Sequence, residues 1–212
     1  LREVDKQLVI TDRLQTLGGQ TFAVSGSFTG KLRIALLGRH QVRNACTALL
    51  VIQQLRERGW KIADAAIERG LAAATWPGRL DIVSRQPFIL VDGAHNNDGV
   101  DSLVTFLNEM KDELPTPSVL VVAAKQGKNV DELRDKIVAR FAQVIVTQGN
   151  FEPMPASELA QILQQGGRQG ETISDVAQAI ARAKQVVVPD GMILITGSLY
   201  MVGDALQVLR PA

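Results

Sequence analysis

From residue 88 onward, short apolar runs alternate with longer stretches of helical spacing. The runs are continuous rather than alternately apolar and polar, as in strands covered on both faces, and they span 88–91, 119–123, 144–147 and 192–196. Helical patterns lie between and after them, near 99–113, 130–141, 156–165, 174–187 and 199–209. Buried strands that alternate with helices need right-handed crossovers. The pattern therefore predicts an α/β domain with a doubly wound, mostly parallel sheet.

The first part of the chain has a different pattern. Runs that alternate or cluster apolar residues are separated by Gly18-Gly19 and Thr29-Gly30, and they predict a small antiparallel β-meander with strands near 7–11, 20–24 and 31–36. Two helical patterns follow, one that ends at Gly59 and one over 64–74. This part is expected to form a meander with two helices.

Thr75-Trp76-Pro77-Gly78 separates the two parts. Pro77 has no N–H and restricts Trp76 to extended geometry, so a helix cannot continue through it. We therefore place a domain boundary here, with one domain over 1–75 and another over 76–212. The second domain, at about 135 residues, is long enough to form a core of its own.

Composition excludes several classes of protein. The 212 residues carry a net charge of +1 and only 4% aromatic side chains, which gives no basis for binding nucleic acid or an anionic membrane. The single cysteine, Cys46, excludes a disulfide framework and a thiolate metal cluster. No apolar run approaches the ~18–20 residues of a membrane span. We expect a soluble, cytoplasmic protein without a metal site in this chain.

The ends of the predicted strands are where ligands bind in open parallel sheets. The first strand is followed by Asp92-Gly93-Ala94-His95-Asn96-Asn97-Asp98-Gly99, which places carboxylates, amides and a histidine where a helix should begin. A helix N-terminus suits an anionic group. Asp92 and Asn96 are also residues that turns and N-caps use anywhere, and a histidine such as His95 can be structural.

Familiar phosphate-binding and catalytic motifs are absent from the sequence. No Gly-x-Gly-x-x-Gly follows a strand, and there is no P-loop, no Gly-x-Ser-x-Gly and no His-Glu-x-x-His. Lys125 and Lys128 flank Gly127 after the second strand and could hold phosphate, although exposed lysines are commonly just solvated. The glycine-rich stretch 166–170 is expected to be a surface loop.

Four segments in order resemble the folylpolyglutamate synthase and dihydrofolate synthase family, of the Mur ligase superfamily. They are Leu37-Gly38-Arg39-His40-Gln41-Val42-Arg43-Asn44-Ala45, Trp76-Pro77-Gly78-Arg79-Leu80, Val91-Asp92-Gly93-Ala94-His95-Asn96 and Thr196-Gly197-Ser198-Leu199-Tyr200. The resemblance covers almost the whole chain. It implies that 1–75 is the tail of an ATPase domain and that 76–212 is the Rossmann-like C-terminal ligase domain.

The resemblance also implies a reaction and its substrates. The family adds L-glutamate to a folate or pteroate carboxylate at the expense of ATP, through an acyl phosphate. The P-loop and most Mg²⁺ ligands would precede Leu1, so the chain alone is expected to be inactive. The full-length enzyme is expected to be a monomer. Positioning and neutralisation of phosphate charge carry this kind of chemistry.

Roles for individual residues follow from the same resemblance. Asn44 would hydrogen-bond the nucleotide, Arg79 would reach its phosphates, and Asp92 would accept its ribose hydroxyls. His95 would face the reacting groups or glutamate as the catalytic residue, and Ser198 would help to hold the incoming amino acid. The residues by themselves leave open a salt-bridge role for Arg79 and a purely helical role for Asn44.

Two segments depart from the family pattern. A Lys-Asp-Lys-Asp-like run is usual where this chain has Lys125-Gln126-Gly127-Lys128-Asn129, and a Pro-Arg-Ala-like stretch is common where it has Met154-Pro155-Ala156-Ser157. These departures leave the preferred substrate open. Two alternatives also remain, namely a non-catalytic nucleotide-binding module and another Mur-type ligase that joins amino acids to a UDP-sugar.

Overall fold

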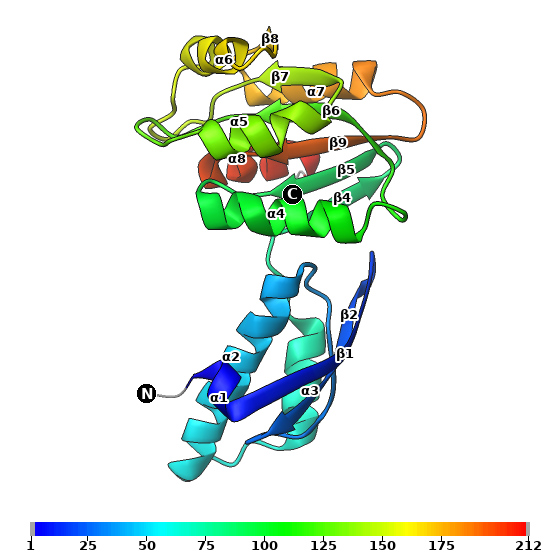
Figure 1. Ribbon diagram of the computed structural model, residues 1–212, viewed down its shortest axis with the longest axis vertical. Coiled ribbons are helices and arrows are strands. Elements are labelled where there is room, and N and C mark those ends of the chain that lie inside the picture. Colours follow the sequence, from blue (N-terminus) through cyan, green and yellow to red (C-terminus); the bar gives the residue numbers. More distant parts are fainter. Residues whose placement is uncertain (1–2, 211–212) are drawn as a thin grey trace. The chain divides into compact units, whose positions relative to one another are not determined.

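The computed structural model describes residues 3–210. The chain forms two compact units, one that ends at Trp76 and one that begins at Pro77 (Figure 1). This division lies within one residue of the boundary placed from Pro77. The origin of the first unit as part of an ATPase domain remains a prediction.

The first unit packs two long helices on a small antiparallel sheet of strand order β1-β2-β3, and a short helix precedes the sheet. Its elements are α1 (Val4–Gln7), β1 (Leu8–Thr16), β2 (Gly19–Gly26), β3 (Gly30–Ile34), α2 (Arg39–Glu57) and α3 (Asp64–Ala73). Helix α2 buries Val42, Cys46 and Leu49 against the sheet, because these residues recur at helical spacing. Gly59, with a φ of 92°, follows the end of α2 in the conformation that commonly ends a helix. The predicted meander with helices is confirmed.

The second unit contains a six-stranded sheet of strand order β4-β5-β9-β6-β7-β8. Its strands are β4 (Asp81–Arg85), β5 (Phe88–Asp92), β6 (Thr116–Val122), β7 (Gln143–Val146), β8 (Glu171–Thr172) and β9 (Gly191–Thr196). Its helices are α4 (Asn97–Glu109), α5 (Asp131–Lys136), the 3-10 turn η1 (Val138–Arg140), α6 (Ala156–Gln165), α7 (Val176–Val186) and α8 (Leu199–Leu209). All neighbouring strands are parallel except β4 and β5. The predicted α/β class is confirmed.

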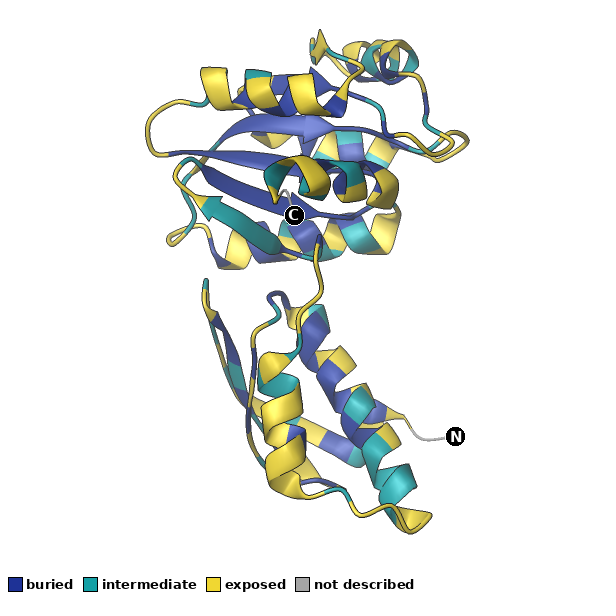
Figure 2. Ribbon diagram, turned by 180° about the vertical axis from the view of Figure 1, so that it is seen from behind, coloured by how far each residue is buried: buried dark blue, intermediate teal, exposed yellow. Residues whose placement is uncertain are grey.

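Helices cover both faces of this sheet. Figure 1 shows α4 and α5 in front of the sheet and α7 and α8 behind it. The chain crosses the sheet in one direction from β5 to β8 and returns from β8 to β9, so right-handed crossovers place α7 on the face opposite α4 and α5. Helix α8 follows the last strand and packs beside α7. Alternate strand residues, such as Val91, Val121 and Ile195, pack in one cluster with α7 and α8. Figure 2 shows the buried strands between helices whose outer faces are exposed.

Three details differ from the sequence-based expectation. Strand β4 was not predicted, because an edge strand covered on one side lacks the continuous apolar run of a central strand, and its residues are only partly buried. Strand β8 has two exposed residues and gives no pattern at all. The helix expected over 130–141 ends at Lys136 and continues only as η1.

Candidate active site

The carboxyl ends of β5, β9 and β6 lie side by side at one edge of the sheet. Asp92, Thr196 and Val122 are aligned there across the three strands. The chain leaves β5 towards α4 on one face and leaves β9 towards α8 on the other face. Ligands of open α/β sheets bind where neighbouring connections diverge in this way. The expected location of the site therefore follows from the strand order.

Asp92 is buried at this edge, with 6% of its surface exposed. Its Oδ2 accepts a hydrogen bond from the Leu80 N–H and its Oδ1 accepts one from the Ala94 N–H, both at 2.9 Å. Burial raises the pKa of Asp92 from 3.8 to about 6, although the two backbone donors and the nearby Arg79 and His95 oppose the shift. The carboxylate is thus the centre of a hydrogen-bonded turn.

The carbonyl oxygen of Gly93 joins Arg79 to His95. Arg79 Nη1 donates to this oxygen at 3.3 Å, and His95 Nδ1 donates to it at 2.9 Å. Gly93 N–H in turn donates to Gly78 O at 2.9 Å. The donation from Nδ1 fixes the ring tautomer and leaves Nε2 as the acceptor nitrogen of His95. The structure therefore brings together three of the residues that the sequence proposed, Arg79, Asp92 and His95.

The start of α4 completes this part of the site. Asn96 is the N-cap, and its Oδ1 accepts a hydrogen bond from Gly99 N–H at 2.9 Å. A narrow crevice opens beside it, lined by His95, Lys128 and Asn129 among others. Lys128 and the first turn of α4 favour a negatively charged group there, whereas Glu132, in the same lining, opposes one.

Ser198 is the N-cap of α8, and its Oγ accepts a hydrogen bond from Met201 N–H at 3.5 Å. The serine is 4% exposed, so capping is its visible role. The next residue, Leu199, lies over Gly93, since a Cβ built on Gly93 would be 2.3 Å from Leu199 Cδ2. The loop after β9 and the loop after β5 are therefore in contact.

Asn44 belongs to the first unit. It lies on an exposed part of α2, and its Nδ2 donates to Gln41 Oε1 at 3.0 Å. This local contact is compatible with a polar residue early in a helix. A role towards the nucleotide remains a prediction.

Comparison with known proteins identifies the family. Residues 78–199 match the family model described as "Mur ligase, glutamate ligase domain". The chain belongs to the Mur ligase family. The matched segment includes every element of the second unit from β4 to β9, so the predicted resemblance is confirmed for the α/β part of the chain.

Relatives of this Mur ligase chain carry the names folylpolyglutamate synthase and dihydrofolate synthase. The folylpolyglutamate synthase of Lacticaseibacillus casei is 31% identical over 179 residues, which cover 84% of this chain and 40% of that protein. The dihydrofolate synthase/folylpolyglutamate synthase of Bacillus subtilis is 30% identical over 186 residues, or 84% of this chain and 41% of that protein.

A solved structure extends the similarity to both units. Folylpolyglutamate synthase of Mycobacterium tuberculosis complexed with ADP aligns with 98% of this chain and 49% of its own chain, at a TM-score of 0.85 and 26% identity. The chain thus spans about half the length, or less, of these relatives.

The two segments of this Mur ligase chain that depart from the family pattern lie next to each other. Met154 N–H donates to Ala124 O at 2.9 Å, and Lys125 forms an isolated antiparallel bridge with Pro153. Lys125 Nζ is 2.7 Å from Glu152 Oε2 and lies over the rings of Phe151 and Tyr200. Lys125 was singled out from the sequence, but its grouping with these residues was not, because they come from two separate loops and the first turn of α8.

Among residues 3–210, no three His, Cys, Asp or Glu side chains are grouped in a way that could hold a metal ion. None of the helices in this part of the chain is both long and apolar enough to cross a membrane.

Proposed function

We propose that this chain is part of an ATP-dependent ligase that adds L-glutamate to folates, and also to dihydropteroate. The observation that carries the proposal is the Arg79–Gly93–His95 arrangement at the strand edge, in a domain of the glutamate ligase family. In the proposed reaction, a carboxylate oxygen of the acceptor attacks the γ-phosphorus of ATP, the bond from that phosphorus to the β–γ bridging oxygen breaks, and ADP leaves as the acyl phosphate forms. The amine of glutamate then attacks the carbonyl carbon, and phosphate leaves.

Arg79 has the chemistry that the phosphates require. Its guanidinium is permanently charged and presents donors in a planar fork, which matches phosphate oxygens better than an ammonium does. Its Nη1 contact with Gly93 O anchors one side of the fork next to the start of α4. We propose that Arg79 neutralises charge on the phosphates as the acyl phosphate forms.

His95 is proposed as the catalytic residue. Because Nδ1 donates to Gly93 O, Nε2 can accept a proton or a hydrogen bond. The incoming amine must lose a proton as the amide forms, and an imidazole nitrogen at this edge is suited to take it. Ser198 is proposed to contact the same amino acid, although its hydroxyl also caps α8.

Asp92 and Asn44 are the proposed contacts of the nucleoside. Each carboxylate oxygen of Asp92 has a second lone pair beyond the one that its backbone donor uses, so the acid can accept a ribose hydroxyl. Its burial and its two backbone partners favour an additional role, which is to hold the turn that carries Arg79 and His95. Asn44 offers an exposed amide from the first unit.

ATP and Mg²⁺ are the implied nucleotide and metal. The residues present fit part of the nucleotide's contacts, and Mg²⁺ would neutralise phosphate charge. This sequence has no P-loop, so we propose that the main phosphate and Mg²⁺ contacts lie in a preceding segment. The full-length protein is further proposed to be a cytoplasmic monomer.

The proposal is tested by ADP release from the full-length product of the gene that encodes this chain. Mg-ATP is supplied with glutamate and, in turn, tetrahydrofolate, dihydropteroate or a UDP-sugar acceptor. Release that requires both glutamate and a pterin acceptor supports the proposal and ranks its substrates. Release only with the UDP-sugar supports a different Mur-type ligase, and binding of ATP without release under any condition supports a non-catalytic module.

A further inference from the structure

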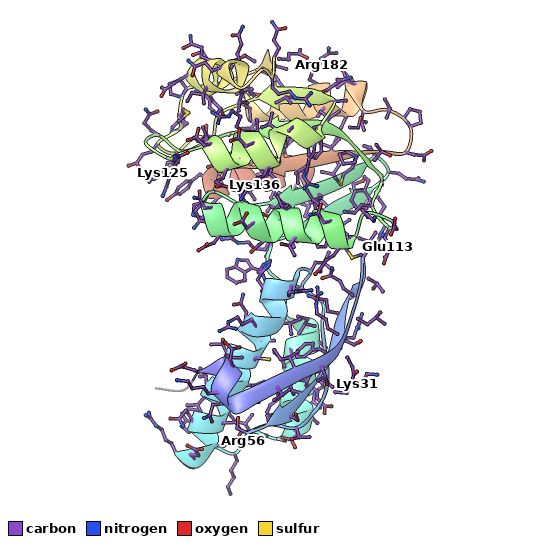
Figure 3. The ribbon with its side chains drawn as sticks, viewed as in Figure 1. Lys31, Arg56, Glu113, Lys125, Lys136 and Arg182 are labelled. Atoms are coloured by element: carbon purple, nitrogen blue, oxygen red, sulfur yellow. The ribbon has the colours of Figure 1, made fainter. Side chains whose placement is uncertain are left out.

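Two loops of the second unit and the first turn of α8 meet in a cluster of four side chains, which we call the rim cluster: Lys125, Phe151, Glu152 and Tyr200. Lys125 follows β6, Phe151 and Glu152 follow β7, and Tyr200 lies in the first turn of α8 after β9. All three strands end at the edge that carries Arg79 and His95. Figure 3 shows Lys125 at this end of the sheet.

The rim cluster contains one ion pair and two aromatic rings. Lys125 Nζ is 2.7 Å from Glu152 Oε2, and it lies 5.5 Å from the centroid of the Phe151 ring and 5.8 Å from that of the Tyr200 ring. The two rings are tilted by 36° with their centroids 4.4 Å apart. Hydrogen bonding to Glu152 raises the pKa of Lys125, which favours its ammonium form.

The cluster remains open to solvent. Phe151 and Tyr200 are 48% and 44% exposed, and the side chains of Lys125 and Glu152 are 33% and 59% exposed. Main-chain bonds hold the loops together, since Gln126 N–H donates to Glu152 O at 3.0 Å. Glu152 also has a φ of 40°, a left-handed conformation that costs energy for a residue with a side chain. The loop thus keeps a charged residue beside Lys125 at a cost in backbone strain.

An adjacent positive and negative charge, with aromatic faces beside them, match a particular kind of ligand. A free α-amino acid carries an ammonium and a carboxylate on neighbouring atoms. Its carboxylate can accept from Lys125, and its ammonium can donate to Glu152 and approach the ring faces. A purely anionic ligand would meet the carboxylate of Glu152 as well, and like charges repel.

We propose that the rim cluster binds the zwitterionic head of the amino-acid substrate and selects it over molecules that lack the amine. The assignment of this substrate rests on the proposed ligase function. Within it, Lys125 and Glu152 are specificity residues, and Phe151 and Tyr200 provide the surface against which the ammonium lies.

Direct binding tests the proposal without reference to activity. The ¹⁵N-labelled 212-residue chain is titrated with L-glutamate and, at the same ionic strength, with glutarate, which has both carboxylates but no amine. We expect L-glutamate to shift the amide signals of 125–126, 151–152 and 199–200, and to bind at least about fivefold more tightly than glutarate. Equal affinities, or shifts that fall elsewhere, would overturn the proposal.

Two variants that should change the affinity for glutarate in opposite directions sharpen this test. Lys125→Met should weaken binding of both ligands, because both use its ammonium. Glu152→Gln should weaken L-glutamate but strengthen glutarate, because it removes the acceptor of the amine and the repulsion of the second carboxylate. If the ion pair only fastened the loops together, both variants would change both ligands in the same direction.

A matched control comes from another exposed ion pair. Arg182 Nε is 2.9 Å from Glu171 Oε2, with side chains 42% and 47% exposed, and Figure 3 shows Arg182 on α7 well separated from Lys125. Glu171→Gln should leave both affinities unchanged. If Glu171→Gln changed the two affinities as much as Glu152→Gln does, the change would come from the overall charge of the protein, and this would contradict the proposal.

Kinetics of the full-length gene product separate the two proposals. With an active ligase, Glu152→Gln should raise KM for glutamate at least about tenfold while kcat and KM for ATP change less than about threefold. An unchanged KM for glutamate would overturn the rim cluster and leave the ligase function standing. An inactive full-length protein whose chain still binds L-glutamate at these residues would overturn the ligase function alone.

Discussion

The carboxylate of Asp92 holds the backbone of Leu80 in a left-handed conformation. Asp92 Oδ2 accepts the Leu80 N–H at 2.9 Å, and Leu80 has a φ of 45° with only 3% of its surface exposed. A leucine in this region costs energy, so the hydrogen bond and the burial must compensate for it. The strained residue immediately follows Arg79. Asp92, at the end of β5, therefore fixes the direction in which the side chain of Arg79, the proposed phosphate-binding residue, projects from the backbone.

Asp92 should make the stability of the second unit depend on pH. Its folded pKa of about 6 lies above the ordinary 3.8, so the folded state binds more protons than the unfolded state between these values. The free energy of unfolding should then decrease as pH rises from 4 to 6, by up to about 3 kcal/mol from this residue. Asp92→Asn should remove this slope.

The measurement is urea unfolding followed at the amide signals of the second unit. Tryptophan fluorescence is unsuitable, because Trp60 and Trp76 both lie in the first unit. A wild-type slope that equals the slope of the asparagine variant would show that Asp92 titrates normally.

Arg79→Ala in the full-length protein should lower turnover by at least about tenfold, a loss of over ~1.4 kcal/mol of transition-state stabilisation. Arg79→Lys should restore only part of it, since an ammonium lacks the planar fork. Steady-state kinetics of both variants provide the test, with Arg182→Ala on α7 as the control. Turnover near the wild-type value in Arg79→Ala would refute the phosphate role.

Gly197 should tolerate no side chain. Its φ is 103°, and a Cβ there would lie 2.1 Å from the carbonyl oxygen of Ala123. Gly197→Ala should destabilise the second unit by at least about 2 kcal/mol through strain and displacement of β9 from β6. Gly203→Ala is the matched control, since it lies inside α8 with no atom within 4 Å of an added Cβ. It should stabilise by roughly 0.5–1 kcal/mol. Similar melting temperatures for the two variants would contradict this account.

The 212-residue chain by itself should hydrolyse no ATP and bind it weakly, because it has no P-loop. A phosphate-release assay on the purified chain checks this expectation. Steady hydrolysis that Asp92→Ala abolishes would mean that the chain holds a complete ATP site. The proposal that a preceding segment supplies the main phosphate and Mg²⁺ contacts would then be wrong.

The sequence predicted most of the second unit because its central strands are buried on both faces. Continuous apolar runs such as 119–123 and 192–196 indicate strands of a parallel sheet. The polar residues that follow them indicate the end of the sheet at which ligands bind. The edge strand β4 was not predicted. Asp81–Arg85 is covered on one side only, so it lacks the continuous apolar run of a central strand.

The site was predictable only where its residues are close in sequence. Asp92 and His95 share one loop, so their proximity follows from the strand end. The inward orientation of Asp92 towards Leu80 depends on the fold of a turn twelve residues earlier, which no local pattern specifies. The rim cluster depends on contacts among the loops after β6 and β7 and the first turn of α8. Lys125 could be proposed from its position after a predicted strand, but its ion pair with Glu152 could not be predicted from the sequence.

The proposed full-length ligase activates a pterin acceptor as an acyl phosphate. The most direct test supplies the acceptor with ¹⁸O in the reacting carboxyl group, together with Mg-ATP and glutamate, and analyses the released phosphate by mass spectrometry. Attack of the carboxylate on phosphorus, followed by cleavage of the carbon–oxygen bond by the amine, transfers one ¹⁸O to each phosphate, and this is the predicted result. Phosphate that carries no label, released at the same rate, would contradict the account.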